Sequence, residues 1–111
     1  MEYAKIENKD SYGLTWYEHA QPYLGSHRGM RFRIARDPMD DVSLKAEKDK
    51  GEANFVVIIW PEPYSFESTS DEEKETAEFP FTVEGKEAMI EWLNEQYVKQ
   101  YDRWEAARAK H

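Results

Sequence analysis

Cysteine is absent from this chain of 111 residues. That absence excludes a disulfide framework, a thiolate metal site and a cysteine nucleophile. The five glycines are scattered and form no glycine-rich loop that could cradle a phosphate group. No GxSxG motif, HExxH motif or P-loop occurs either. The sequence therefore predicts a protein that is not an enzyme and that needs no metal or other cofactor.

Long apolar segments are missing as well. The longest purely apolar run covers residues 55–60, whereas a membrane-spanning helix needs about 20 apolar residues. The first ten residues are charged and contain no apolar core segment, so no signal peptide is predicted. We therefore expect a cytoplasmic protein that does not interact with membranes.

Negative charge exceeds positive charge, with 23 Asp and Glu against 15 Lys and Arg and a net charge of −8. The two parts of the chain differ, because residues 1–36 carry a net +2 and residues 37–111 a net −10. A net acidic protein is repelled at long range by nucleic acids and by anionic membranes. We therefore do not expect direct binding to nucleic acid, and an acidic surface would suit a basic partner.

Two segments carry clear strand patterns. Residues 30–35 alternate between apolar and polar side chains, which predicts a half-buried strand with Arg31 and Arg33 facing outward. Residues 53–60 form the strongest predicted strand and are apolar on both faces. Aromatic alternation, turn residues and a capping box supply the other expectations. These are a strand at 12–18, a loop at 21–29, a short strand at 42–45, an edge or extended segment at 64–67, and a short helix from 70 toward 78.

The strongest single pattern is a long amphipathic helix within residues 79–110, with Thr82 as its predicted N-cap. Met89, Leu93, Tyr97 and Trp104 share its apolar stripe. Carboxylates lie on the opposite side, and like charges four residues apart cost about 0.2–0.5 kcal/mol per pair. The carboxylates of this outer side are Glu84, Glu87, Glu91, Glu95 and Asp102.

Together these elements predict one α+β domain over residues 1–111. An antiparallel meander sheet of three to four strands would pack against one long C-terminal helix. The strand and helix patterns also predict which residues form the core. The predicted core residues are Phe32, Ile34, Phe55, Val57, Ile59, Leu93 and Tyr97.

One helix covers only one face of a sheet, so the second apolar face of residues 53–60 needs another cover. The candidates are the segment 70–78, the N-terminal residues or another subunit. The predicted helix is also long enough to overhang a domain of this size, which would expose Tyr101 and Trp104. Exposed aromatic residues mark interfaces, so we expect a protein partner or a homodimer.

Three functions are open from the sequence. The leading hypothesis is a small non-enzymatic interaction or regulatory protein that binds a protein partner through the acidic helix face or an aromatic surface. The partner-binding candidates are Glu84, Glu87, Glu91, Glu95, Tyr101, Asp102 and Trp104. One alternative is an acidic mimic of nucleic acid that inhibits a DNA- or RNA-handling enzyme. The other is an enzyme with an anion or phosphate site, in which a histidine acts as general base beside arginine forks. The anion-binding candidates are His27, Arg28, Arg31 and Arg33.

Overall fold

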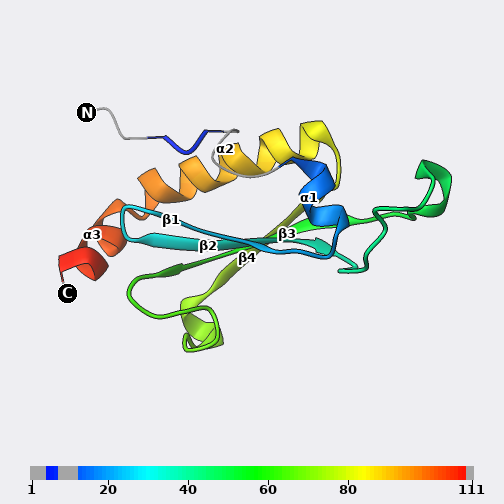
Figure 1. Ribbon diagram of the computed structural model, residues 1–111. Coiled ribbons are helices and arrows are strands. Elements are labelled where there is room, and N and C mark those ends of the chain that lie inside the picture. The colour runs from blue at the N-terminus through cyan, green and yellow to red at the C-terminus, as the bar shows by residue number, and fades with distance from the viewer. Residues whose placement is uncertain (1–4, 8–12, 110–111) are drawn as a thin grey trace.

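The computed structural model describes residues 5–7 and 13–109 (Figure 1). Its elements, in chain order, are α1 (Leu14–Glu18), β1 (Tyr23–His27), β2 (Met30–Asp37), the 3-10 turn η2 (Glu47–Asp49), β3 (Asn54–Pro61), the 3-10 turn η3 (Asp71–Glu73), β4 (Glu75–Pro80), α2 (Val83–Lys99) and α3 (Tyr101–Ala109). The four strands of the described chain form an antiparallel sheet in the order β1-β2-β3-β4. The fold is therefore α+β, a meander sheet packed against a long C-terminal helix, as predicted.

The core lies between the sheet and α2, which covers one sheet face (Figure 1). In the register of β2 and β3, Phe32 lies opposite Ile59 and Ile34 lies opposite Val57. Strand alternation directs these side chains to the face that meets α2. All seven predicted core residues are at most 3 % exposed, which confirms the prediction: Phe32, Ile34, Phe55, Val57, Ile59, Leu93 and Tyr97.

The C-terminal helix is divided at Gln100. Thr82 caps α2 as predicted, because its hydroxyl oxygen accepts a hydrogen bond from Gly85 N–H at 2.9 Å. At Gln100 the backbone leaves helical geometry, with φ −113° and ψ 26°, and α3 begins at Tyr101. The prediction of one unbroken helix is therefore wrong. The break lets α3 turn toward the end of the sheet (Figure 1), where Trp104 enters the core.

Residues 12–18 were expected to form a strand, but the described part of this segment contains α1. Tyr17 is fully buried and meets Phe55 edge to face, with 5.3 Å between the ring centroids. A helix places Leu14 and Tyr17 on the same side, whereas a strand would separate them. Tyr12 lies outside the described residues.

Residues 21–29 were expected to form a loop, but they contain β1. Gly25 contributed to the loop prediction, because glycine is common in turns. In the structure it lies within the strand because of how the neighbouring side chains pack. A Cβ atom at Gly25 would lie 2.5 Å from Cζ of Phe32. Only glycine fits where the Phe32 ring crosses β1, which is one of the uses of glycine within a strand.

Three further expectations also need correction. Residues 42–45 form no strand, and the nearby pairing is an isolated bridge between His19 and Asp41. Residues 64–67 lie in turns rather than in an extended edge segment. The helix expected from residue 70 is only the single turn η3, because β4 begins at Glu75 and pairs with β3. Tertiary pairing overrides the local helix signal there.

None of the helices in residues 5–7 and 13–109 combines the length and apolar character that crossing a bilayer requires.

Candidate functional site: the open face of the sheet

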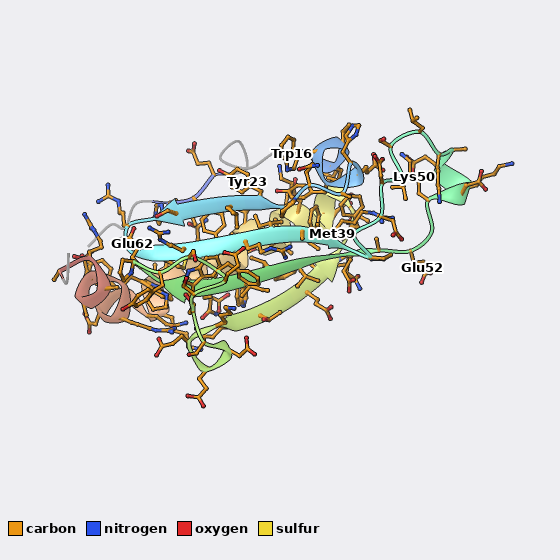
Figure 2. All side chains as sticks on the ribbon, turned by 60° about the horizontal axis from the view of Figure 1, so that its bottom comes forward. Trp16, Tyr23, Met39, Lys50, Glu52 and Glu62 are labelled. Atoms are coloured by element: carbon orange, nitrogen blue, oxygen red, sulfur yellow. The ribbon has the colours of Figure 1, made fainter. Side chains whose placement is uncertain are left out.

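The sheet face opposite α2 is called here the open sheet face, and Figure 2 turns it toward the viewer. Two cross-strand rows build it. One row runs from Leu24 through Arg33 and Ile58, and the other from Ser26 through Arg31 and Trp60. Leu24 is 61 % exposed and Ile58 is half-buried. Apolar side chains on this face are therefore only partly shielded from water.

The β3–β4 segment (residues 62–74) covers the Trp60 end of this face, and Figure 1 shows it on the side of the sheet away from α2. Trp60 is buried, and its Nε1–H donates to the Tyr64 carbonyl oxygen at 2.8 Å. Phe66 packs on Trp60 with 5.5 Å between ring centroids. Two cations lie over the Phe66 ring, Lys74 Nζ at 4.0 Å and Arg33 Cζ at 5.1 Å from its centroid. The second face of β3 is thus covered in part by residues 62–74, of which only the last few belong to the expected segment 70–78.

Two arginines on this face have no carboxylate partner among the residues that the structure describes. Neither Arg31 nor Arg33 forms an ion pair with any residue of the described chain. Arg31 Nε is buried and makes no hydrogen bond there. Arg33 Nη2 donates to the Met39 sulfur at 3.6 Å. A buried donor left without an acceptor costs about 1–3 kcal/mol, and within the described chain Arg31 Nε is such a donor.

A shallow hollow of about 300 Å³ lies beside Arg31. Its walls come from β1, from Trp60 and from Phe66 of the β3–β4 segment. Glu62 lies at the same end of the face (Figure 2) and accepts a hydrogen bond from Ser26 Oγ at 3.2 Å. The hollow therefore combines a guanidinium group, aromatic walls, hydroxyl groups and the carboxylate of Glu67.

The predicted anion-binding residues do not converge. His27 belongs to the sheet face that α2 covers, and its ring meets Tyr97 of α2 edge to face at 4.6 Å between centroids. Arg31 and Arg33 point to the other face, and exposed Arg28 lies in the turn between β1 and β2. Because His27 and the two strand arginines occupy opposite faces, they cannot act on one bound phosphate.

The outer face of α2 carries the acidic row that the sequence predicted. Glu84, Glu87, Glu91 and Glu95 are all exposed, and none forms an ion pair within the described chain. Asp102 is exposed on α3. These carboxylates therefore lie in solvent. Exposure is expected both of an ordinary solvated helix face and of a recognition surface.

The aromatic helix end is not a surface. Trp104 is 0 % exposed, and its Nε1–H donates to the Gln96 carbonyl oxygen at 3.2 Å. Tyr101 is half-buried against Tyr97, with 5.8 Å between the ring centroids. The expected exposure of Trp104 is wrong because the break at Gln100 turns α3 inward. Because Trp104 has no exposed surface, it is not available to contact a partner.

A second cleft of about 600 Å³ opens at the base of the β2–β3 segment (residues 38–53). Three of the charged side chains that line it form ion pairs with one another. Lys50 Nζ contacts Glu18 at 2.9 Å and Glu47 at 2.7 Å, and hydrogen bonding to these two carboxylates raises the pKa of Lys50. Arg36 of the same lining donates to backbone carbonyl oxygens on both sides of the segment, so these contacts hold the cleft together.

Among the described residues, no group of three or more His, Asp or Glu side chains is placed to hold a metal ion.

The sequence indicated that Arg31 and Arg33 face outward but missed Leu24, Met39 and Phe66 as their neighbours. Leu24 escaped notice because β1 was read as a loop. The proximity of Phe66 depends on the path of residues 62–74, and neither the prolines at 61 and 63 nor the capping box at 70 indicates that path.

No protein-family model, curated protein or solved structure matches this chain.

Proposed function

We propose that the protein is a non-enzymatic interaction protein and that a protein partner binds its open sheet face. The observation that supports this function is the pair Arg31 and Arg33, which lack a carboxylate partner in the described chain. They lie beside apolar side chains that remain partly exposed, Leu24 and Ile58. Protein interfaces combine these features, because arginine and aromatic residues are enriched where apolar surface is buried on binding.

The enzyme alternative has less support than the binding function. It required His27 as a general base beside the arginine strand. A general base must reach the reacting group within hydrogen-bond distance, directly or through one water. Here the sheet itself separates His27 from Arg31 and Arg33.

The outer face of α2 is a second candidate surface, and the acidic nucleic-acid mimic belongs to it. Glu87, Glu91 and Glu95 recur about every 6 Å along the helix axis and are exposed. A mimic of this kind would bind a basic nucleic-acid-handling protein, and its affinity would fall steeply as salt is raised. Contacts through apolar residues of the open sheet face would depend much less on salt.

Site-specific photo-crosslinking in the organism that encodes the protein tests both surfaces. The photoreactive residue p-benzoylphenylalanine replaces Leu24 on the open sheet face in one variant and Val98 on α2 in a matched control. Both native side chains are exposed and apolar, at 61 % and 46 %. Val98 follows Glu91 and Glu95 on the same helix side, seven and three residues later.

The proposed function predicts an adduct with a defined protein from position 24 and none from position 98. Adducts from position 98 alone would instead favour the acidic row of α2. No adduct from position 24 overturns the proposed function. An adduct with a second copy of the chain would identify a homodimer, which light scattering on the wild type and on Leu24→Glu would then show as a dimer and a monomer.

A further inference from the structure

Arg31 and Arg33, which form no ion pair within residues 5–7 and 13–109, have the spacing of an extended strand. Arg31 and Arg33 are two residues apart on β2, so both point to the open sheet face. Their Cα atoms are separated by roughly 6.7 Å, twice the rise per residue of an antiparallel strand. An extended partner segment has the same repeat, and it presents its own residues i and i+2 on one side.

The chemistry of the two sites is that of carboxylate recognition. The planar guanidinium group forms two parallel hydrogen bonds with a carboxylate, which makes such pairs stronger than neutral hydrogen bonds. The protein has 23 acidic residues, yet none in the described chain forms an ion pair with Arg31 or Arg33. Both side chains are half-buried, so a carboxylate bound there is partly removed from water and interacts more strongly.

Apolar side chains continue the face beyond Arg33. Ala35, which is 3 % exposed, is the next residue of β2 on this side; half-buried Val56 lies opposite it on β3, and Met39 is 42 % exposed. Figure 2 shows Met39 and Glu62 at opposite ends of the face. A segment running along β2 would thus place its next residue in register, at i+4, among apolar side chains. The Glu62 end is acidic and would repel a third carboxylate.

We infer that the open sheet face binds an extended acidic segment of a protein partner, whose carboxylates at positions i and i+2 pair with Arg31 and Arg33 and whose residue i+4 is apolar. This inference rests on the proposed function and names the chemistry of its partner.

Three fluorescein-labelled, end-capped octapeptides serve as probes. The first is Ser-Gly-Glu-Thr-Glu-Thr-Leu-Ser, with the two glutamates in the i, i+2 spacing. The second, Ser-Gly-Glu-Thr-Thr-Glu-Leu-Ser, has the same composition, but its i, i+3 spacing sends one carboxylate to the opposite side of an extended chain. The third replaces both glutamates of the first peptide by glutamine. Fluorescence anisotropy gives the dissociation constant of each peptide.

The first peptide is expected to bind at least about tenfold more tightly than either control, since hydrogen bonds between a guanidinium group and a carboxylate are stronger than neutral hydrogen bonds. Arg31→Gln and Arg33→Gln should each weaken its binding by about the same factor. Lys45→Gln makes the same change of charge at an exposed position of the β2–β3 segment and should leave binding unchanged. A thermal melt verifies that each variant is folded.

Equal affinities for the first two peptides would overturn the inference, because binding would then depend on net charge and not on strand spacing. Tighter binding of a labelled oligouridylate than of the first peptide would also overturn it and would assign the arginines to nucleic acid. The two proposals fail separately. A protein adduct from position 24 without peptide binding would overturn the inference of an acidic segment and leave the proposed protein-binding function standing. Spacing-dependent peptide binding without an adduct would overturn the proposed function and leave the carboxylate recognition standing.

Discussion

The side-chain amide of Asn94 holds the backbone of Ile6 through two hydrogen bonds. Ile6 N–H donates to Asn94 Oδ1 at 2.7 Å, and Asn94 Nδ2–H donates to the Ile6 carbonyl oxygen at 2.8 Å. The side chain of Ile6 is 4 % exposed and belongs to the core. One amide of α2 thus satisfies both backbone polar groups of a buried residue near the start of the chain, which docks residues 5–7 on this helix.

Removing this amide should destabilise the fold. Asn94→Ala leaves the N–H and C=O groups of Ile6 without their partners, and we expect a loss of about 1–3 kcal/mol in the free energy of unfolding. Urea denaturation measures it. The adjacent exposed residue provides the control, because Glu95→Ala should change stability by no more than about 0.5 kcal/mol. Equal effects of the two substitutions would show that the amide does not hold Ile6 in solution.

Burial of Trp104 makes a second prediction. Trp104→Ala should lower the free energy of unfolding by about 3–5 kcal/mol, as truncation of a large core side chain does. Val98→Ala, at a position 46 % exposed on the preceding helix, should cost about 0.5 kcal/mol or less. Guanidinium denaturation measures the free energy of unfolding of both variants and of the wild type. A small loss for Trp104→Ala would place this ring on the surface.

The centre of the fold could be predicted from the sequence because its periodicities are strong and agree with one another. Alternation at Phe32 and Ile34 identified β2 and its inner face, and the helical stripe through Leu93 identified the inner side of α2. Those residues face one core, so local pattern and tertiary packing specify the same structure. The outward direction of Arg31 and Arg33 followed from the same alternation.

Strand β1 and the break between α2 and α3 could not be predicted from the sequence, because contacts between distant parts of the chain determine them. Gly25 signals a turn in isolation, and only the ring of Phe32 above it explains a strand. The helix break at Gln100 has no proline or glycine to announce it; Gln100 donates instead to Glu75 of β4 at 2.7 Å. The candidate surface shares this difficulty, since Phe66 meets Arg33 only through the fold of residues 62–74.

Tyr97 predicts how stability depends on alkaline pH. Burial, and secondly the nearby Tyr101, raises the pKa of the Tyr97 hydroxyl above its ordinary value of 10.0. A raised folded-state pKa means that the unfolded chain loses its proton first as the pH rises. The stabilising contribution is therefore complete below about pH 10 and is lost as the pH passes through the folded-state pKa.

Tyr97→Phe should consequently flatten the fall in unfolding free energy above about pH 10, relative to the wild type. Urea denaturation at a series of alkaline pH values gives the slope for each protein. Tyr64→Phe is the matched control, because Tyr64 is 62 % exposed and its substitution should leave the wild-type slope unchanged. A wild-type slope in Tyr97→Phe would mean that other groups cause the alkaline loss.

Arg36 closes the base of the β2–β3 segment. Its Nη1–H donates to the Pro38 carbonyl oxygen at 2.7 Å and its Nη2–H to the Lys50 carbonyl oxygen at 3.0 Å, so one guanidinium group joins the two arms of residues 38–53. The side chain is 2 % exposed, and its Cζ lies 5.4 Å from the centroid of the Phe81 ring. Arg36→Met keeps an apolar stem of similar length but removes both hydrogen bonds, which should let the two arms separate without unfolding the sheet.

Limited proteolysis detects this local opening. A glutamate-specific protease should cut Arg36→Met after Glu47 or Glu52, both exposed in this segment, several-fold faster than the wild type under native conditions. The protease does not recognise arginine, so the substitution leaves its cleavage sites intact. Arg31→Met is the matched control, since it makes the same chemical change on β2 at a side chain that bonds neither arm. Equal cleavage of the two variants would show that the β2–β3 segment is held by other contacts, such as the ion pairs of Lys50 with Glu18 and Glu47.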